Sequence, residues 1–144
     1  MKSFYLVVIF IMIACSGHAI AAQDVYVLIN GKESPEAVTY QQDSTKINVV
    51  SGSSITITVE ANPTTGYGWQ LADPLQEKII VLSGHRYKAP KANRRVGVGG
   101  WDMWLFKTVG AGKTIVTLEY VRSWEKGVAP VKKKVFVITV SPSS

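Results

Sequence analysis

The chain has 144 residues, a net charge of +6 at neutral pH, one cysteine and two histidines. This length suits one domain with an ordinary apolar core and leaves little room for a second. A single cysteine excludes an internal disulfide, and these few sulfur and imidazole groups exclude a structural zinc site. The positive charge is too mild to indicate nucleic acid binding, and no recognition motif for nucleic acid is present.

The first 22 residues have the pattern of a secretory signal peptide. Lys2 supplies the positive start, residues 4–14 are almost entirely apolar, and Ala-Ile-Ala at 19–21 fits the pattern that a signal peptidase recognises. The apolar run is well short of the roughly 20 residues of a membrane span. We expect cleavage after Ala21 or Ala22.

Cleavage would change the chemistry of the remaining domain, residues 23–144. The only cysteine, Cys15, would be lost, so stability must come from apolar packing. His18 would be lost as well, which leaves His85 as the one histidine. We expect this single domain to be secreted or periplasmic. Lipidation at Cys15 is the alternative, because the residues before it loosely resemble a bacterial lipobox.

Most of the remaining sequence has the character of β-strands. Residues 55–60 alternate apolar and polar side chains, as a half-buried strand does. Other segments are rich in β-branched and aromatic residues and are separated by Gly, Pro, Asn and Ser. Residues 31–45 are predicted to be a polar loop with at most one helical turn. The pattern favours an all-β sandwich. The predicted strands are residues 25–30, 46–50, 55–60, 79–82, 101–109, 114–122 and 135–140.

Residues 109–113 form a short glycine-containing link between two predicted strands. Such a link is typical of a β-hairpin, so strands 101–109 and 114–122 are expected to pair antiparallel. The loop before Trp101 and the loop after Arg122 would then leave the same end of the sandwich. Loops gathered at one end of a sandwich commonly serve recognition.

The most distinctive string in the chain is N-P-T-T-G-Y-G-W at residues 62–69. Pro63 restricts its own φ and pushes Asn62 into an extended conformation. Gly66 can adopt the positive φ that a tight turn requires. The two threonines between them are β-branched and stiff at χ1. We expect a short, rigid projection that exposes hydroxyl groups.

Two further motifs accompany this string, G-V-G-G at 97–100 and R-S-W at 122–124. Together, and in this order, the three motifs resemble those of the chagasin-type family, which inhibits papain-like cysteine proteases. Family members more often have proline at the position of Ser123. The resemblance covers nearly all of residues 23–144. It implies an immunoglobulin-like antiparallel β-sandwich that presents three loops as a wedge.

The resemblance also implies a reversible, competitive and non-covalent inhibitor that occludes the active-site cleft of a protease. The loop around Thr64 would enter the catalytic centre, and residues 94–100 would lie along the unprimed side. Val96 or Val98 would fill the pocket that sets specificity, and the third loop would take the primed side. The expected protease-binding residues are Asn62, Pro63, Thr64, Thr65, Gly66, Tyr67, Arg94, Arg95, Val96, Gly97, Val98, Gly99, Gly100, Arg122, Ser123 and Trp124.

Several individual side chains have expected places in the fold. Trp69 and Trp104 are expected in the core, whereas Trp124, between Ser and Glu in a polar loop, is expected to be exposed. His85 is expected at the surface or at a strand end. Three consecutive lysines at 132–134 are expected to protect a sheet edge from mispairing.

The expected partners are papain-like cysteine proteases, either the organism's own or a host's. We expect a non-enzymatic monomer with no catalytic residue, cofactor, metal, nucleic acid or small-molecule substrate. One histidine without a G-x-S-x-G elbow does not suit a hydrolase, and G-V-G-G lacks the lysine and helix of a phosphate loop. The alternative is a secreted β-sandwich module for carbohydrate binding or adhesion. Such a module would depend on exposed Trp101 or Trp124 and not on Thr64.

Overall fold

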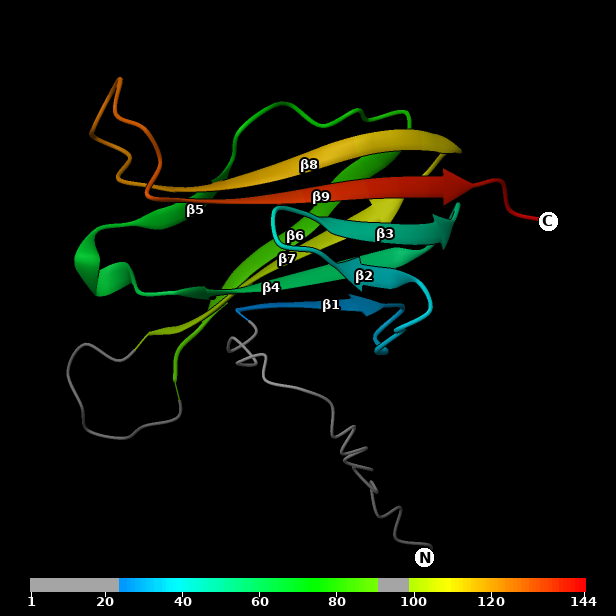
Figure 1. Cartoon of the computed structure of the whole chain (residues 1–144), viewed down its shortest axis with the longest axis horizontal. Helices are drawn as coiled ribbons and strands as arrows, with labels where there is room; N and C mark the ends of the chain where they lie inside the picture. The colour runs from blue at the N-terminus through cyan, green and yellow to red at the C-terminus, as the bar shows by residue number, and fades with distance from the viewer. Residues whose placement is uncertain (1–23, 91–98) are drawn as a thin grey trace, which may run out of the picture.

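The computed structural model describes residues 24–90 and 99–144, which form two packed β-sheets with one 3-10 turn and no α-helix in those ranges (Figure 1). Strands β1, β4, β7 and β6, in that order, form a four-stranded sheet, and β2, β3, β9, β8 and β5 form a five-stranded sheet. Neighbouring strands are antiparallel except β3 and β9, which are parallel. The predicted immunoglobulin-like sandwich is confirmed. The elements are β1 (Val25–Ile29), β2 (Val38–Tyr40), β3 (Thr45–Val50), β4 (Ser54–Ala61), η1 (Pro63–Thr65), β5 (Gly68–Leu71), β6 (Ile80–Lys88), β7 (Gly100–Thr108), β8 (Gly112–Val121) and β9 (Lys132–Ser141).

Alternating side chains from both sheets fill the space between them. Every second side chain is buried from 100 to 108 in β7 and from 114 to 120 in β8. Phe106 is fully buried, and Trp69 and Trp104 are buried as predicted. Burial of apolar surface stabilises a fold by roughly 25 cal/mol per Å². The packed sheets are therefore a firm platform for the loops at their ends.

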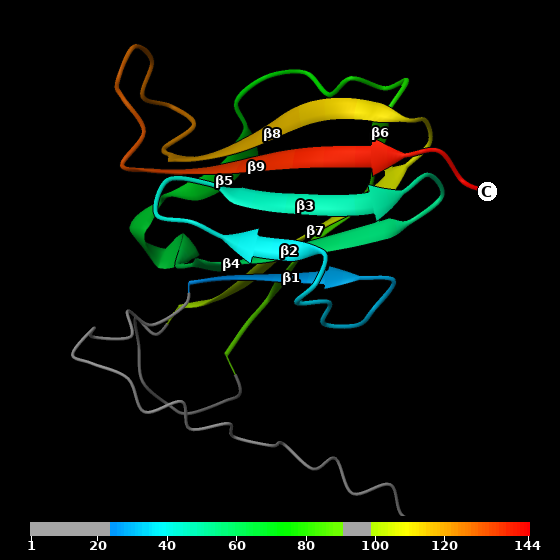
Figure 2. The ribbon, with the colours of Figure 1, turned by 45° about the vertical axis from the view of Figure 1, so that its right-hand side comes forward.

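The link at residues 109–113 joins the two sheets instead of closing a hairpin, so the predicted pairing of its flanking strands is wrong. β7 pairs with β4 and β6, whereas β8 pairs with β5 and β9. The N–H groups of Val109 and Gly110 donate to the carbonyl oxygen of Ile79, at 2.8 and 3.4 Å. A short glycine link suits either arrangement. The chain reverses direction in both, so the start of β7 and the end of β8 still lie at the same end of the sandwich (Figure 2).

Two strands, β2 and β5, lie outside the predicted strand ranges, and β6 and β9 are longer than predicted. β2 lies inside residues 31–45, where a loop was expected, and its buried Val38 covers the edge of the core. Three residues are too few to show a period. β6 continues to Lys88 beyond the predicted end, because a bulge between Leu82 and Gly84 shifts the register and interrupts the alternation.

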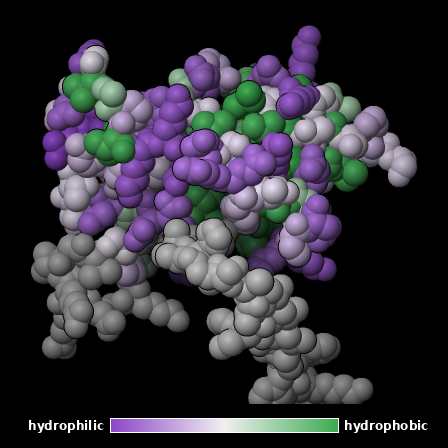
Figure 3. Space-filling view, viewed as in Figure 1, coloured by the Kyte–Doolittle hydropathy of each residue, from purple (hydrophilic) through white to green (hydrophobic). Residues whose placement is uncertain are grey.

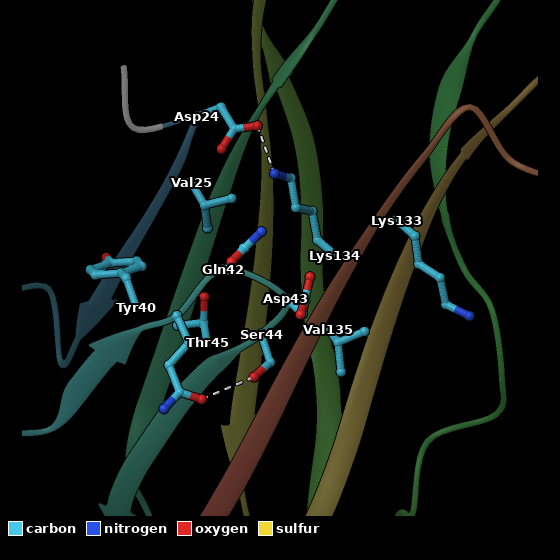
Figure 4. A pocket seen from close by; sticks show the side chains of 11 residues that line it. Asp24, Val25, Tyr40, Gln42, Asp43, Ser44, Thr45, Lys133, Lys134 and Val135 are labelled. Atoms are coloured by element: carbon cyan, nitrogen blue, oxygen red, sulfur yellow. Dashed lines mark hydrogen bonds and ion pairs between the residues drawn. The ribbon is translucent and has the colours of Figure 1, made fainter. Parts of the chain in front are cut away.

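The three lysines at 132–134 begin β9, which lies between β3 and β8. β3 pairs with β9 only from Phe136 onward, so the lysines pair with β8 on one side and with no described strand on the other. They therefore lie at a locally open edge of the sheet, and their role in edge protection stays a prediction. The Nζ atom of Lys134 is 2.6 Å from Oδ2 of Asp24. This ion pair borders a hollow of about 590 Å³ that opens where β1, β3 and β9 begin (Figure 4). The lysines thus lie at the end of the sandwich where β4 and β8 end.

His85 lies within β6 and not at a strand end, and its side chain is partly exposed. Its Nε2 atom is 2.6 Å from Oδ1 of Asp102, and its ring stacks on Trp104 with 3.9 Å between centroids. The indole N–H of Trp104 donates to Oδ2 of Asp102 at 3.2 Å. The buried carboxylate therefore has two partners, which tie β6 to β7 near the base of the 89–99 segment.

Some predictions fall on residues outside the described ranges and remain predictions. Within 24–90 and 99–144, no helix has the length and apolar character needed to cross a membrane. The predictions outside these ranges are the signal peptide at 1–22, lipidation at Cys15, and the contact residues Arg94, Arg95, Val96, Gly97 and Val98.

Candidate functional site

Parts of all three motifs meet at one end of the sandwich, on the left in Figure 1. Residues 62–67, here called the η1 loop, follow β4, and residues 122–131, here called the β8–β9 loop, follow β8. A Cβ atom placed on Gly66 would lie 2.5 Å from Cη2 of Trp124. A Cβ placed on Gly99 would lie 2.9 Å from the carbonyl oxygen of Ala61. The predicted contact residues that the structure describes therefore lie together at this end, although Gly100 is buried and does not reach the surface.

The η1 loop is closed by its own hydrogen bonds. Asn62 is extended, with φ −130° and ψ 90°, and its Oδ1 accepts from the N–H of Thr64 at 3.3 Å and from its hydroxyl at 2.6 Å. Gly66 has φ 79°, and its N–H donates to the carbonyl of Pro63 at 3.0 Å. The hydroxyl of Thr65 donates to the carbonyl of Asn62 at 2.7 Å. The expected roles of proline and glycine in this turn are confirmed.

An aromatic cluster holds the base of the η1 loop. The hydroxyl of buried Tyr120 accepts from the N–H of Asn62 at 2.9 Å and donates to its carbonyl at 3.3 Å. Tyr67 stacks on Tyr120 with 5.5 Å between ring centroids, and Trp69 lies 4.9 Å away on the same ring. The indole N–H of Trp69 donates to the carbonyl of Glu60 at 2.9 Å. The loop is thus anchored to β8 as well as to its own strands.

Arg122 braces the η1 loop from the β8–β9 loop. Its guanidinium carbon lies 4.4 Å from the centroid of the Tyr67 ring. Its Nε and Nη2 atoms donate to the carbonyl of Thr65, both at 3.4 Å, and Nη1 is 3.3 Å from Oε1 of Glu125. The sequence predicted Arg122 as a contact to a partner. In the free protein its charge is already used to hold two loops together.

Tyr120 and Lys132 are site residues that the sequence reasoning missed. A hollow of about 530 Å³ lies between the η1 loop and Gly99, and both side chains line it with Arg122. The Lys132 ammonium lies 5.7 Å from the centroid of the Tyr120 ring. The available signal was a tyrosine on the buried face of a strand, because a buried phenol usually has a hydrogen-bond partner.

Replacing Tyr120 with phenylalanine is expected to lower the free energy of unfolding by about 1–2 kcal/mol, because it leaves the Asn62 N–H without its partner. Chemical denaturation measures this loss, and amide hydrogen exchange should become faster at Asn62. Tyr26→Phe is the matched control, since the exposed Tyr26 hydroxyl bonds to none of the described residues. Equal stability of the two variants would show that Tyr120 does not anchor the loop.

The chemistry of this surface suits binding. In the described ranges no group of three or more His, Cys, Asp or Glu side chains is placed to hold a metal ion. The exposed tip carries the Thr64 and Thr65 hydroxyls, and the exposed indole of Trp124 stands beside it as predicted. A rigid tip with an aromatic flank is the type of surface that anchors protein–protein interfaces.

Comparison with known proteins places this surface in a family. The model of the chagasin family peptidase inhibitors, I42, matches residues 48–140. Amoebiasin-2 of Entamoeba histolytica is 28% identical over 104 residues, which cover 72% of this chain and 83% of that protein. The crystal structure of the cysteine protease inhibitor EhICP2 from Entamoeba histolytica has a TM-score of 0.59 and 25% identity, over 69% of this chain and 88% of that one. The solution structure of Amebosin shares the fold, with a TM-score of 0.51, 24% identity and coverage of 70% and 90%.

The family match covers more than half of the chain and includes the η1 loop, Gly99 and the R-S-W motif. Both the family and EhICP2 are described as inhibitors, which supports protease inhibition and a non-enzymatic role. The resemblance inferred from the three motifs is confirmed. The chain belongs to the chagasin family of peptidase inhibitors.

Proposed function

We propose that this protein is a reversible, competitive and non-covalent inhibitor of papain-like cysteine proteases. The η1 loop would enter the catalytic centre, flanked by the 94–100 segment and the β8–β9 loop. The observation that carries this proposal is the packing of Gly66 against Trp124, which joins two family motifs into one projection. The description of EhICP2 as a cysteine protease inhibitor supports the class of target.

Pre-organisation explains how such a surface gains affinity. A protease–inhibitor interface buries about 1,600 Å² in total, and association first costs several kcal/mol of lost freedom. The η1 loop loses little on binding, because Asn62, Tyr120 and Arg122 already hold it. More of the contact energy then appears as affinity.

The shape of the tip would also protect the inhibitor from cleavage. Peptides bound by strand-like pairing are extended, so that their main-chain groups align with the partner. Residues Pro63–Thr65 form instead a 3-10 turn. No peptide bond at the tip is then presented as a substrate would present it. The residues from 23 onward contain no cysteine, so no thiol is available for a covalent trap.

Titration of the purified protein against papain with a small fluorogenic peptide tests the proposal. We expect hydrolysis to fall to near zero at equimolar inhibitor, the apparent KM to rise while kcat stays unchanged, and activity to return on dilution. Trypsin, a serine protease, should be unaffected. Undiminished hydrolysis by several papain-like enzymes at excess inhibitor would refute the proposal.

We also propose that the protein is exported, with its mature end at Ala22 or Gln23. Intact mass and amino-terminal sequencing of protein from the native cell test this proposal. A mature chain that begins at Cys15 and carries the mass of acyl groups would establish lipidation instead. A chain that keeps Lys2 would contradict export by this route.

A further inference from the structure

The β8–β9 loop exposes large apolar side chains in addition to Trp124. Trp124 is 66% exposed, Val128 60% and Val131 56%. Figure 3 shows apolar surface at the upper left, where Figure 1 places this loop. Scattered apolar side chains on a surface are ordinary, whereas a group of them in one loop often marks an interaction site.

The loop is held in place, so this exposure is part of the fold. The N–H of Val131 donates to the carbonyl of Tyr120 at 3.1 Å, and the N–H of Glu125 donates to the carbonyl of Arg122 at 3.1 Å. Gly127 has φ 73°, which turns the chain between these two attachments. The two valines are thus presented from a loop that is fixed at both ends.

The two valines lie beside residues that hold the η1 loop in place. Val128 and Val131 border a small hollow, of about 20 Å³, together with Tyr67, Arg122 and Glu125. They therefore form an apolar rim beside the Arg122–Glu125 ion pair. A partner that covered this rim would exclude water from the ion pair and strengthen it, because charges interact more strongly where water is absent.

We propose that Val128 and Val131 extend the inhibitory surface beyond Trp124 and dock on an apolar, weakly charged wall of the protease beside its cleft. This inference rests on the proposed function. Val128 follows Trp124 by four positions, so their Cα atoms are at most about 14 Å apart. One side of a standard interface is about 800 Å², or about 30 Å across. Val128 therefore lies within the span of an interface that includes the η1 loop and Trp124.

Serine substitutions with matched controls test this extension. Val128→Ser and Val131→Ser are each expected to raise the dissociation constant for papain about fivefold to tenfold, mainly through faster dissociation. Ile115 and Val50, which are 60% and 53% exposed, lie near the ends of β8 and β3 that are away from the loops. Ile115→Ser and Val50→Ser should bind within about twofold of the wild type.

The melting temperature, the salt dependence of binding and the inhibition of papain together decide the outcome. All four variants should keep the wild-type melting temperature, because the replaced side chains are exposed. The effects of Val128→Ser and Val131→Ser should stay constant from about 0.05 to 0.5 M NaCl, since apolar contacts are not screened. If the wild type inhibits papain and the dissociation constants of Val128→Ser and Val131→Ser equal those of the two controls, the extension of the surface is refuted and the proposed function stands. Failure of the wild type to inhibit any papain-like enzyme overturns the proposed function.

Discussion

Replacing Thr64 with glutamate is expected to raise the inhibition constant for papain about 1,000-fold or more, with the fold intact. Thr64 is exposed at the tip of the η1 loop and would be buried in the catalytic centre of the enzyme. A carboxylate there would lose its hydration shell without gaining a partner placed to compensate for it. It would also face Oδ1 of Asn62, which now accepts the Thr64 hydroxyl at 2.6 Å.

Two control variants show whether the added charge at position 64 causes the loss of inhibition. One tests the loss of the Thr64 hydroxyl, and the other tests an added charge elsewhere on the surface. Thr64→Val removes the hydroxyl alone and should weaken inhibition only about tenfold or less. Thr139→Glu places the same charge on the exposed face of β9, next to Lys113 across the strand pair, and should leave inhibition unchanged. Inhibition by folded Thr64→Glu at the wild-type level would show that the tip does not enter the cleft.

Replacing Gly66 with alanine is expected to raise the inhibition constant about 100-fold and to lower the free energy of unfolding by about 1–2 kcal/mol. The added methyl group would lie 2.5 Å from Cη2 of Trp124, so the indole or the turn must move. The positive φ of 79° adds strain for any residue with a Cβ. Either movement would separate the η1 loop from the β8–β9 loop, and the proposed binding mode requires these two loops to be in contact.

The chain supplies controls for each part of this effect. Gly31→Ala tests strain alone, because Gly31 has φ 77° and nothing within 4 Å of a Cβ. Gly68→Ala tests a nearby methyl group that meets nothing within 4 Å. Adding Trp124→Ala to Gly66→Ala should cost little more than Gly66→Ala alone, because neighbours that act together are not additive. Gly66→Ala and Gly68→Ala with equal inhibition constants would argue against the loop-coupling role of Gly66.

The local shape of the η1 loop could be predicted from its own residues. Pro63 restricts its backbone and that of Asn62, and Gly66 permits the left-handed turn; these effects act within one or two residues. The burial of Trp104 was likewise predicted, since the alternation of side chains follows from the pleat of a single strand. The three motifs were sufficient to identify the family before any contact was known.

The partners of each segment were decided only by the tertiary structure. The pairing of the strands on either side of the 109–113 link was predicted wrongly because strand pairing depends on distant residues, and a glycine link has the same local pattern in either arrangement. The roles of Arg122 and Tyr120 were also invisible, because their contacts with the η1 loop join residues more than 50 positions apart. The sequence by itself therefore determined most of the strands, the turn and the family. The fold determined which side chains hold the loops together, because only packing brings those distant groups within hydrogen-bonding distance.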